Sequence, residues 1–172
     1  GTNGTHAINR TLYANTPFDP VRDFAPVSRM TQIAALLVVN PGVPALSVDA
    51  LIAYAKANPG KLTYGASGMA TPMLSAELFK SIAGINLLFV PYKGDAPLMP
   101  ALLDGQIQFA FLTQTVALSH RKAGRLRVLA STGRKRLAIA EDIPTLIEAG
   151  VPVEYESWIG IFAPGRTPRD VV

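Results

Sequence analysis

The feature that most constrains this chain is the segment 62–79, which passes from an apolar strand through a glycine-rich turn into a helix. Thr71 suits the N-cap of that helix, and Pro72 suits its first turn, where no N–H group is needed. Gly65 and Gly68 allow the backbone before it to turn sharply, so that free N–H groups point toward one place. Such a helix start favours a bound anion, although an ordinary strand-to-helix turn has the same pattern.

The same alternation of strands and helices continues along the chain and predicts an α/β sandwich with mainly parallel strands. We expect helices between the cap Ser47 and the stop at Asn58, from Thr71 to a stop at Gly84, and over 97–103, 116–123 and 145–149. Further strands are expected at 24–30, 34–39, 87–90, 106–111, 126–130 and 158–163.

Three of the predicted strand-to-helix junctions carry small or polar residues, at 65–71, 91–96 and 113–115. In open α/β sheets a ligand binds beyond the carboxyl ends of the strands, so we expect the three junctions to face one cleft. Backbone N–H groups, hydroxyls, an amide and the pair Tyr92-Lys93 all suit recognition of a carboxylate. Taken singly, each junction is also compatible with a surface loop that contacts no ligand.

Composition excludes several classes of protein. The 172 residues are 49% hydrophobic, which is enough for a core, yet no apolar run approaches the roughly 20 residues of a membrane span. Absence of cysteine excludes disulfides, zinc–thiolate sites and thiol catalysis. Basic residues give a net charge of +4 and concentrate at 121–136, but no aromatic residue lies among them, so we expect no nucleic-acid partner.

The sequence offers little for catalysis or metal binding. Ser67 follows Gly65 at the spacing of a nucleophile elbow, but Met69 stands where the second glycine is required. Neither His6 nor His120 has an acidic residue nearby in the sequence to orient it as a base. Two distant histidines and scattered carboxylates do not have the spacing of metal ligands. We therefore predict no catalytic residues, no metal and no cofactor.

Several motifs together resemble one known family. They are Gly4-Thr-His-Ala-Ile-Asn9, Asp19-Pro-Val-Arg-Asp-Phe-Ala-Pro-Val27, Leu37-Val-Val-Asn-Pro41, Tyr64-Gly-Ala-Ser-Gly68, Val90-Pro-Tyr-Lys-Gly94, Asp142-Ile-Pro-Thr145, Glu148-Ala-Gly150 and Ala163-Pro-Gly165. In this order they resemble the Bug family, the TctC-like substrate-binding proteins of tripartite tricarboxylate transporters. The resemblance runs through essentially the whole chain.

The resemblance implies a periplasmic-binding-protein type II-like fold of two α/β lobes with mixed, mostly parallel sheets. Such proteins close on a small carboxylate, such as a di- or tricarboxylate or an amino acid, and deliver it to membrane transporter subunits without entering the membrane themselves. A signal peptide absent from this chain would direct the protein to the periplasm. Residues 1–30 and 131–172 are expected in an incomplete lobe one, because relatives have further segments at both ends, and 31–130 in lobe two.

The resemblance also implies a set of ligand-binding residues in both lobes. In lobe one, a loop with Thr5 and His6 is expected to face the cleft, with Trp158 either as a wall of the cleft or as a core aromatic residue. In lobe two, the expected ligand contacts are Ser67, Gly68, Thr71, Tyr92, Lys93, Thr113 and Gln114. Ala70 departs from the family pattern, in which a second glycine commonly precedes the threonine, and its methyl group alters the loop or the pocket size.

Two other functions stay open at this level. One is a co-inducer-sensing or signalling module on the same fold, although no helix-turn-helix pattern is present and DNA contact would require residues outside this chain. The other is a serine-type hydrolase with Ser67 as nucleophile, for which the incomplete elbow and the lack of an oriented base are unfavourable.

Overall fold

The computed structural model describes residues 1–67 and 71–172, with the side chain of Thr71 left out. The chain divides into two compact units, one formed by residues 1–33 and 157–172 and the other by residues 34–156. We call them the terminal unit and the central unit. Residues 131–156 thus pack with the central unit, whereas the sequence placed them in lobe one; the assignment of lobes in a complete protein stays a prediction.

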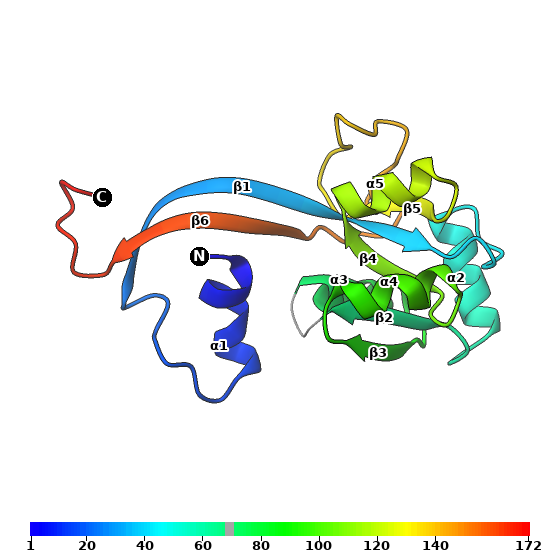
Figure 1. Cartoon of the computed structure of the whole chain (residues 1–172), viewed down its shortest axis with the longest axis horizontal. Helices are drawn as coiled ribbons and strands as arrows, with labels where there is room; N and C mark the ends of the chain where they lie inside the picture. Colours follow the sequence, from blue (N-terminus) through cyan, green and yellow to red (C-terminus); the bar gives the residue numbers. More distant parts are fainter. Residues whose placement is uncertain (68–70) are drawn as a thin grey trace. The chain divides into compact units, whose positions relative to one another are not determined.

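The central unit is built on a mixed β-sheet (Figure 1). Its strands are the second half of β1 (Phe24–Val39), β2 (Thr63–Ser67), β3 (Leu88–Tyr92), β4 (Phe109–Thr113) and β5 (Arg127–Ser131), in the order β3-β2-β4-β1-β5. Strand β2 runs parallel to β3 and β4, while β1 runs antiparallel to β4 and β5. The carboxyl ends of β2, β3, β4 and β5 therefore share one edge of the sheet, and β1 ends at the opposite edge.

Helices cover both faces of this sheet, because the buried strands alternate apolar side chains between the two sides. Leu37 and Val39 face a cluster that includes α2 (Val48–Ala57) and α3 (Thr71–Ala83). Leu36 and Val38 face a second cluster with α4 (Asp95–Leu103) and α5 (Gln114–Lys122). The central unit is thus a three-layer α/β/α sandwich with two apolar interfaces.

The terminal unit consists of η1 (Gly4–Ile8), α1 (Asn9–Leu12), the first half of β1 and the strand β6 (Glu156–Pro164), which pairs with β1. An aromatic cluster takes the place of a core. The ring of His6 stacks on Phe162 with centroids 4.2 Å apart and meets the edge of Phe24 at 4.9 Å, while Phe18 lies 5.4 Å from Phe24. No hydrophobic side chain of this unit is buried.

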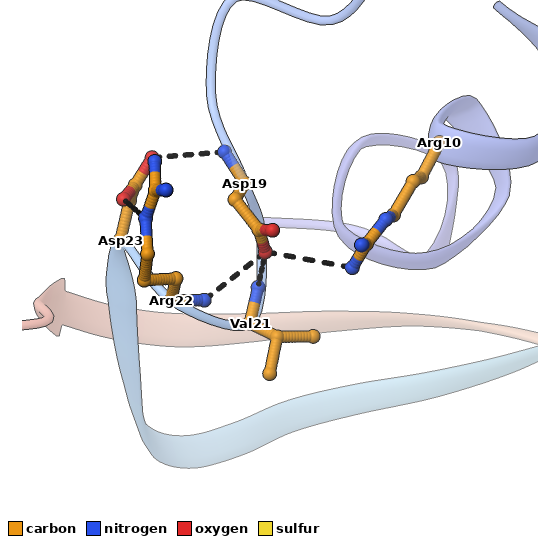
Figure 2. Close-up of polar contacts among 5 residues, drawn as sticks. All are labelled: Arg10, Asp19, Val21, Arg22 and Asp23. Carbon is orange, nitrogen blue, oxygen red and sulfur yellow. Dashed lines mark hydrogen bonds and ion pairs between the residues drawn. The ribbon is translucent and has the colours of Figure 1, made fainter.

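A polar turn joins α1 to β1 (Figure 2). Asp19 Oδ1 accepts hydrogen bonds from the N–H groups of Val21 and Arg22 at 2.9 and 3.1 Å, and the N–H of Asp19 donates to Asp23 Oδ2 at 2.8 Å. Arg22 Nε donates to Asp23 Oδ1 at 2.9 Å, and Arg10 lies 3.5 Å from Asp19 Oδ1. Backbone donors lower the pKa of Asp19, and the Arg22 guanidinium lowers that of Asp23.

The structure corrects three expectations about local structure. Residues 24–39 form one continuous strand where two were predicted, and the distant strand β6 pairs with it. Residues 4–12 are helical, whereas the family resemblance implied a loop around Thr5 and His6. Where a helix was predicted at 145–149, Thr145 forms a bridge with Ser131 and residues 146–149 form turns. Thr145 and Glu148 cap each other reciprocally, but Gly150, with φ of +77°, stops the helix at once.

Candidate functional site

A small cavity lies at the edge of the central unit's sheet where β2 and β4 end. Its volume is about 100 Å³, which suits a carboxylate group rather than a whole drug-sized ligand. One lining residue comes from each of the three predicted junctions: Ser67 at the end of β2, Asp95 at the start of α4 and Thr113 at the end of β4. The other described residues that line it are apolar: Pro72, Leu98, Phe111, Leu112 and Val116.

Two helices start at this cavity without a capping side chain. The N-cap of α4 is Gly94, which has no side chain, and the N-cap of α5 is Thr113, whose side chain makes no capping hydrogen bond. By contrast, the hydroxyl of Ser47 accepts the N–H of Ala50 at 3.1 Å at the start of α2. The first-turn N–H groups of α4 and α5 are therefore left without a side-chain acceptor, and each helix adds partial positive charge there.

Gly94 takes a backbone conformation that favours glycine, with φ of +101°. It allows the chain to leave β3 and enter α4 within two residues, so that Asp95 stands in the first turn next to the cavity. Asp95 is exposed and, among the described residues that line the cavity, it is the only ionisable one. The sequence-based prediction did not include it among the ligand contacts, although Asp95 lies within the predicted junction 91–96.

Two of the predicted contacts at the first junction cannot be placed. Ser67 is half-buried and lines the cavity. Gly68 lies outside the described residues, and Thr71 begins α3 but its side chain is not described. The hydrolase interpretation gains no support here, because no histidine lines the cavity around Ser67.

The other predicted ligand contacts of the central unit include Tyr92, Lys93 and Gln114, whose side chains have different surroundings. The ring of Tyr92 packs beside Gly65 on β2, where an added Cβ would lie 3.1 Å from it, so Tyr92 belongs to the packing of the sheet. Lys93 is exposed and forms no ion pair with any described residue. Gln114 is the first residue of α5, and its side-chain amide donates to the carbonyl of Ala34 at 3.3 Å. Ligand contacts by these residues stay predictions.

The predicted residues of lobe one lie in the terminal unit. Thr5 and His6 belong to the π-helix η1 and not to a loop, and Thr5 Oγ1 lies 2.8 Å from His6 Nδ1. Burial among the phenylalanine rings lowers the pKa of His6, which favours the neutral imidazole. Trp158, on β6, is half-buried and lines a groove of about 500 Å³ together with Arg29 and several apolar residues. It is therefore not a fully buried core residue.

The described residues contain no cluster of histidine and acidic side chains that could hold a metal ion. In the same part of the chain, no helix is long and apolar enough to cross a membrane.

A family model settles the relationship of this chain to known proteins. The model of the tripartite tricarboxylate transporter family receptor matches residues 2–172. The chain belongs to this family. The family is one of receptors, which are binding proteins. Protein BugT of Bordetella pertussis is 32% identical over 169 residues, which are 96% of this chain and 52% of BugT.

Solved structures agree with the family and with the α/β periplasmic-binding-protein fold. A Rhodopseudomonas palustris protein with adipate is 39% identical with a TM-score of 0.88, and MatC from the same organism, with bound malate, is 25% identical with a TM-score of 0.84. The periplasmic binding protein BugD is 28% identical, also with a TM-score of 0.84. Each match covers 99% of this chain but only 57–59% of the other, so the chain spans little more than half of these relatives.

Proposed function

We propose that this chain is part of a periplasmic solute-binding protein that captures a small carboxylate and delivers it to the membrane subunits of a tripartite tricarboxylate transporter. The observation that carries the proposal is the cavity at which α4 and α5 begin without capping side chains. Family membership and the relatives solved with adipate and malate support the carboxylate and the transporter.

The chemistry of the cavity suits one carboxylate group of such a solute. Hydroxyls of Ser67 and Thr113 and the free first-turn N–H groups supply donors, and hydrogen bonds to a charged acceptor contribute about 1.5–3 kcal/mol each. The apolar floor formed by Leu98 and Phe111 limits competing water. No covalent step is involved, so binding stays reversible, as release to a transporter requires.

Binding is best tested on the longest protein encoded by the reading frame that contains this chain. Adipate, malate, succinate, citrate, glutamate and aspartate are added in turn, and the melting temperature and the heat of binding are measured. A selective rise in melting temperature reports binding to the folded state. If none of these carboxylates binds at millimolar concentration, the proposed function is wrong.

A pair of threonine variants tests the position of the site. Thr113 and Thr115 are both exposed and lie two residues apart, but only Thr113 lines the cavity. Thr113→Val, which removes a hydroxyl donor, should raise the Kd of the bound carboxylate about tenfold. Thr115→Val should leave it within about twofold. Equal effects of the two substitutions would place the ligand elsewhere.

A further inference from the structure

The acidic side chain at the cavity has a consequence for the kind of carboxylate that binds there. Asp95 lines the cavity beside two helix starts that attract an anion. Among the described residues it has no hydrogen-bond or ion-pair partner, and no basic side chain lines the same cavity. Its negative charge is therefore not neutralised by a neighbouring cation.

A simple dicarboxylate would meet opposing forces in this cavity. The helix starts attract its carboxylate, while the carboxylate of Asp95 repels any second negative group that comes close. The repulsion is strongest where water is excluded, and the apolar residues Leu98 and Val116 also line the cavity. A solute that carries a cation next to its carboxylate avoids this conflict.

We propose that Asp95 is a specificity residue that accepts the ammonium group of an α-amino carboxylate, so that the protein prefers amino acids, above all amino dicarboxylates, over dicarboxylates without an amino group. This inference rests on the proposed function. It gives the cavity two complementary parts: N–H and hydroxyl donors for the carboxylate of the solute, and one acceptor with full charge for its ammonium group.

A structural role for Asp95 has to be separated from this one. An acidic residue in the first turn also stabilises its own helix through the helix dipole. Asp49 offers a matched control, because it is likewise exposed and lies in the first turn of a helix, α2, but does not line the cavity. A purely helical role would make Asp49→Asn and Asp95→Asn equivalent.

The test compares ligands that differ only in the amino group, aspartate with succinate and glutamate with glutarate, by calorimetry on the longest protein of the reading frame. Of aspartate and glutamate, the one that the unsubstituted protein binds more tightly should have a Kd at least tenfold lower than that of the matched dicarboxylate, succinate or glutarate. Asp95→Asn should reduce this ratio to about one, by weakening aspartate or glutamate and strengthening succinate or glutarate. Asp49→Asn should leave the ratio unchanged.

The outcomes separate this inference from the proposed function. If succinate or glutarate binds as tightly as its amino analogue, the role proposed for Asp95 is wrong. It is also wrong if Asp95→Asn leaves the ratio of the two Kd values unchanged. In both cases the protein remains a carboxylate-binding protein. If no carboxylate of the panel binds, both the proposed function and the inference fail. A melting temperature for each variant, taken without ligand, shows whether any change in affinity is accompanied by a loss of folding.

Discussion

The central and terminal units reach stability in different ways. The central unit buries apolar side chains on both faces of its sheet, and all the buried hydrophobic residues that the structure describes lie between Ala34 and Val153. The terminal unit has a cluster of four half-exposed rings and a polar turn, and it exposes Val21, Met30 and Ile161. Burial of apolar area is the main favourable term in folding, so the candidate site stands on the more stable part of the chain.

The largest difference between the units should appear in the unfolding free energy when one aromatic ring is removed from each unit. Phe109, fully buried between Tyr64 and Phe79, leaves a cavity on replacement, and Phe109→Ala should cost about 3–5 kcal/mol. Phe162→Ala should cost below about 2 kcal/mol, because the ring is only half-buried. Urea unfolding followed by circular dichroism and by the fluorescence of Trp158, the sole tryptophan, distinguishes the units. Equal costs would contradict the comparison.

Strand β1 allows the comparison within one element. Its residues 35–39 pair with both β4 and β5 and are mostly buried, whereas in residues 24–33 no hydrophobic side chain is buried. Backbone amides of 35–39 should therefore exchange with solvent at least about 100-fold more slowly than those of 24–33 in the 172-residue chain. Hydrogen exchange with mass spectrometry measures both segments. Similar rates would mean that the two units open together.

A single hydrogen bond in the central unit should have a smaller effect. The hydroxyl of buried Tyr64 donates to Glu77, which also accepts from Lys80 at 3.0 Å. Tyr64→Phe should cost about 1–2 kcal/mol in unfolding free energy, measured in urea. Tyr54→Phe is the control, because no described partner binds the Tyr54 hydroxyl, and it should be close to neutral. If Tyr64→Phe leaves the unfolding free energy unchanged, the hydrogen bond between Tyr64 and Glu77 does not help to hold α3 against β2.

The smallest effect is expected at the polar turn of the terminal unit. Asp19→Asn keeps an oxygen that can accept from Val21 and Arg22 but loses the negative charge, so the melting temperature at pH 7 should fall slightly, and Asp19→Ala should lower it more. The folded pKa of Asp19 lies below its ordinary value of 3.8, chiefly because of backbone donors. Its contribution is therefore present above pH 3.8 and is lost as the pH falls through the folded pKa. Melting curves between pH 7 and pH 2 check this, and a contribution that grows on acidification would contradict it.

The sequence predicted best those elements whose signals are local. The cap Ser47 starts α2, Gly84 follows the end of α3, and the junction residues Ser67 and Thr113 come to one cavity as the rule for open sheets requires. These features depend on neighbours within a few residues or on strand order.

What the sequence did not predict depends on contacts between distant residues. Strand β1 pairs with β6, more than 100 positions away, and His6 in the helical residues 4–12 contacts rings from three separate segments. Asp95 was missed because the loop prediction placed the start of its helix two residues too late. An acidic side chain in a loop gives no reason to look for a binding role, whereas the same side chain at a helix start beside a cavity does.

The tight contact around Gly65 limits how this protein can change its ligand during evolution. A Cβ at this position would lie 2.4 Å from Cδ1 of Ile107 and 3.1 Å from the ring of Tyr92, so even alanine requires the end of the Ile107 side chain to move and the Tyr92 ring to adjust. A larger residue at position 65 is thus disfavoured in the strand that leads to the cavity. New ligand preferences are more easily acquired at the rim, where Asp95 and Thr113 are exposed and can be exchanged without rebuilding the interior.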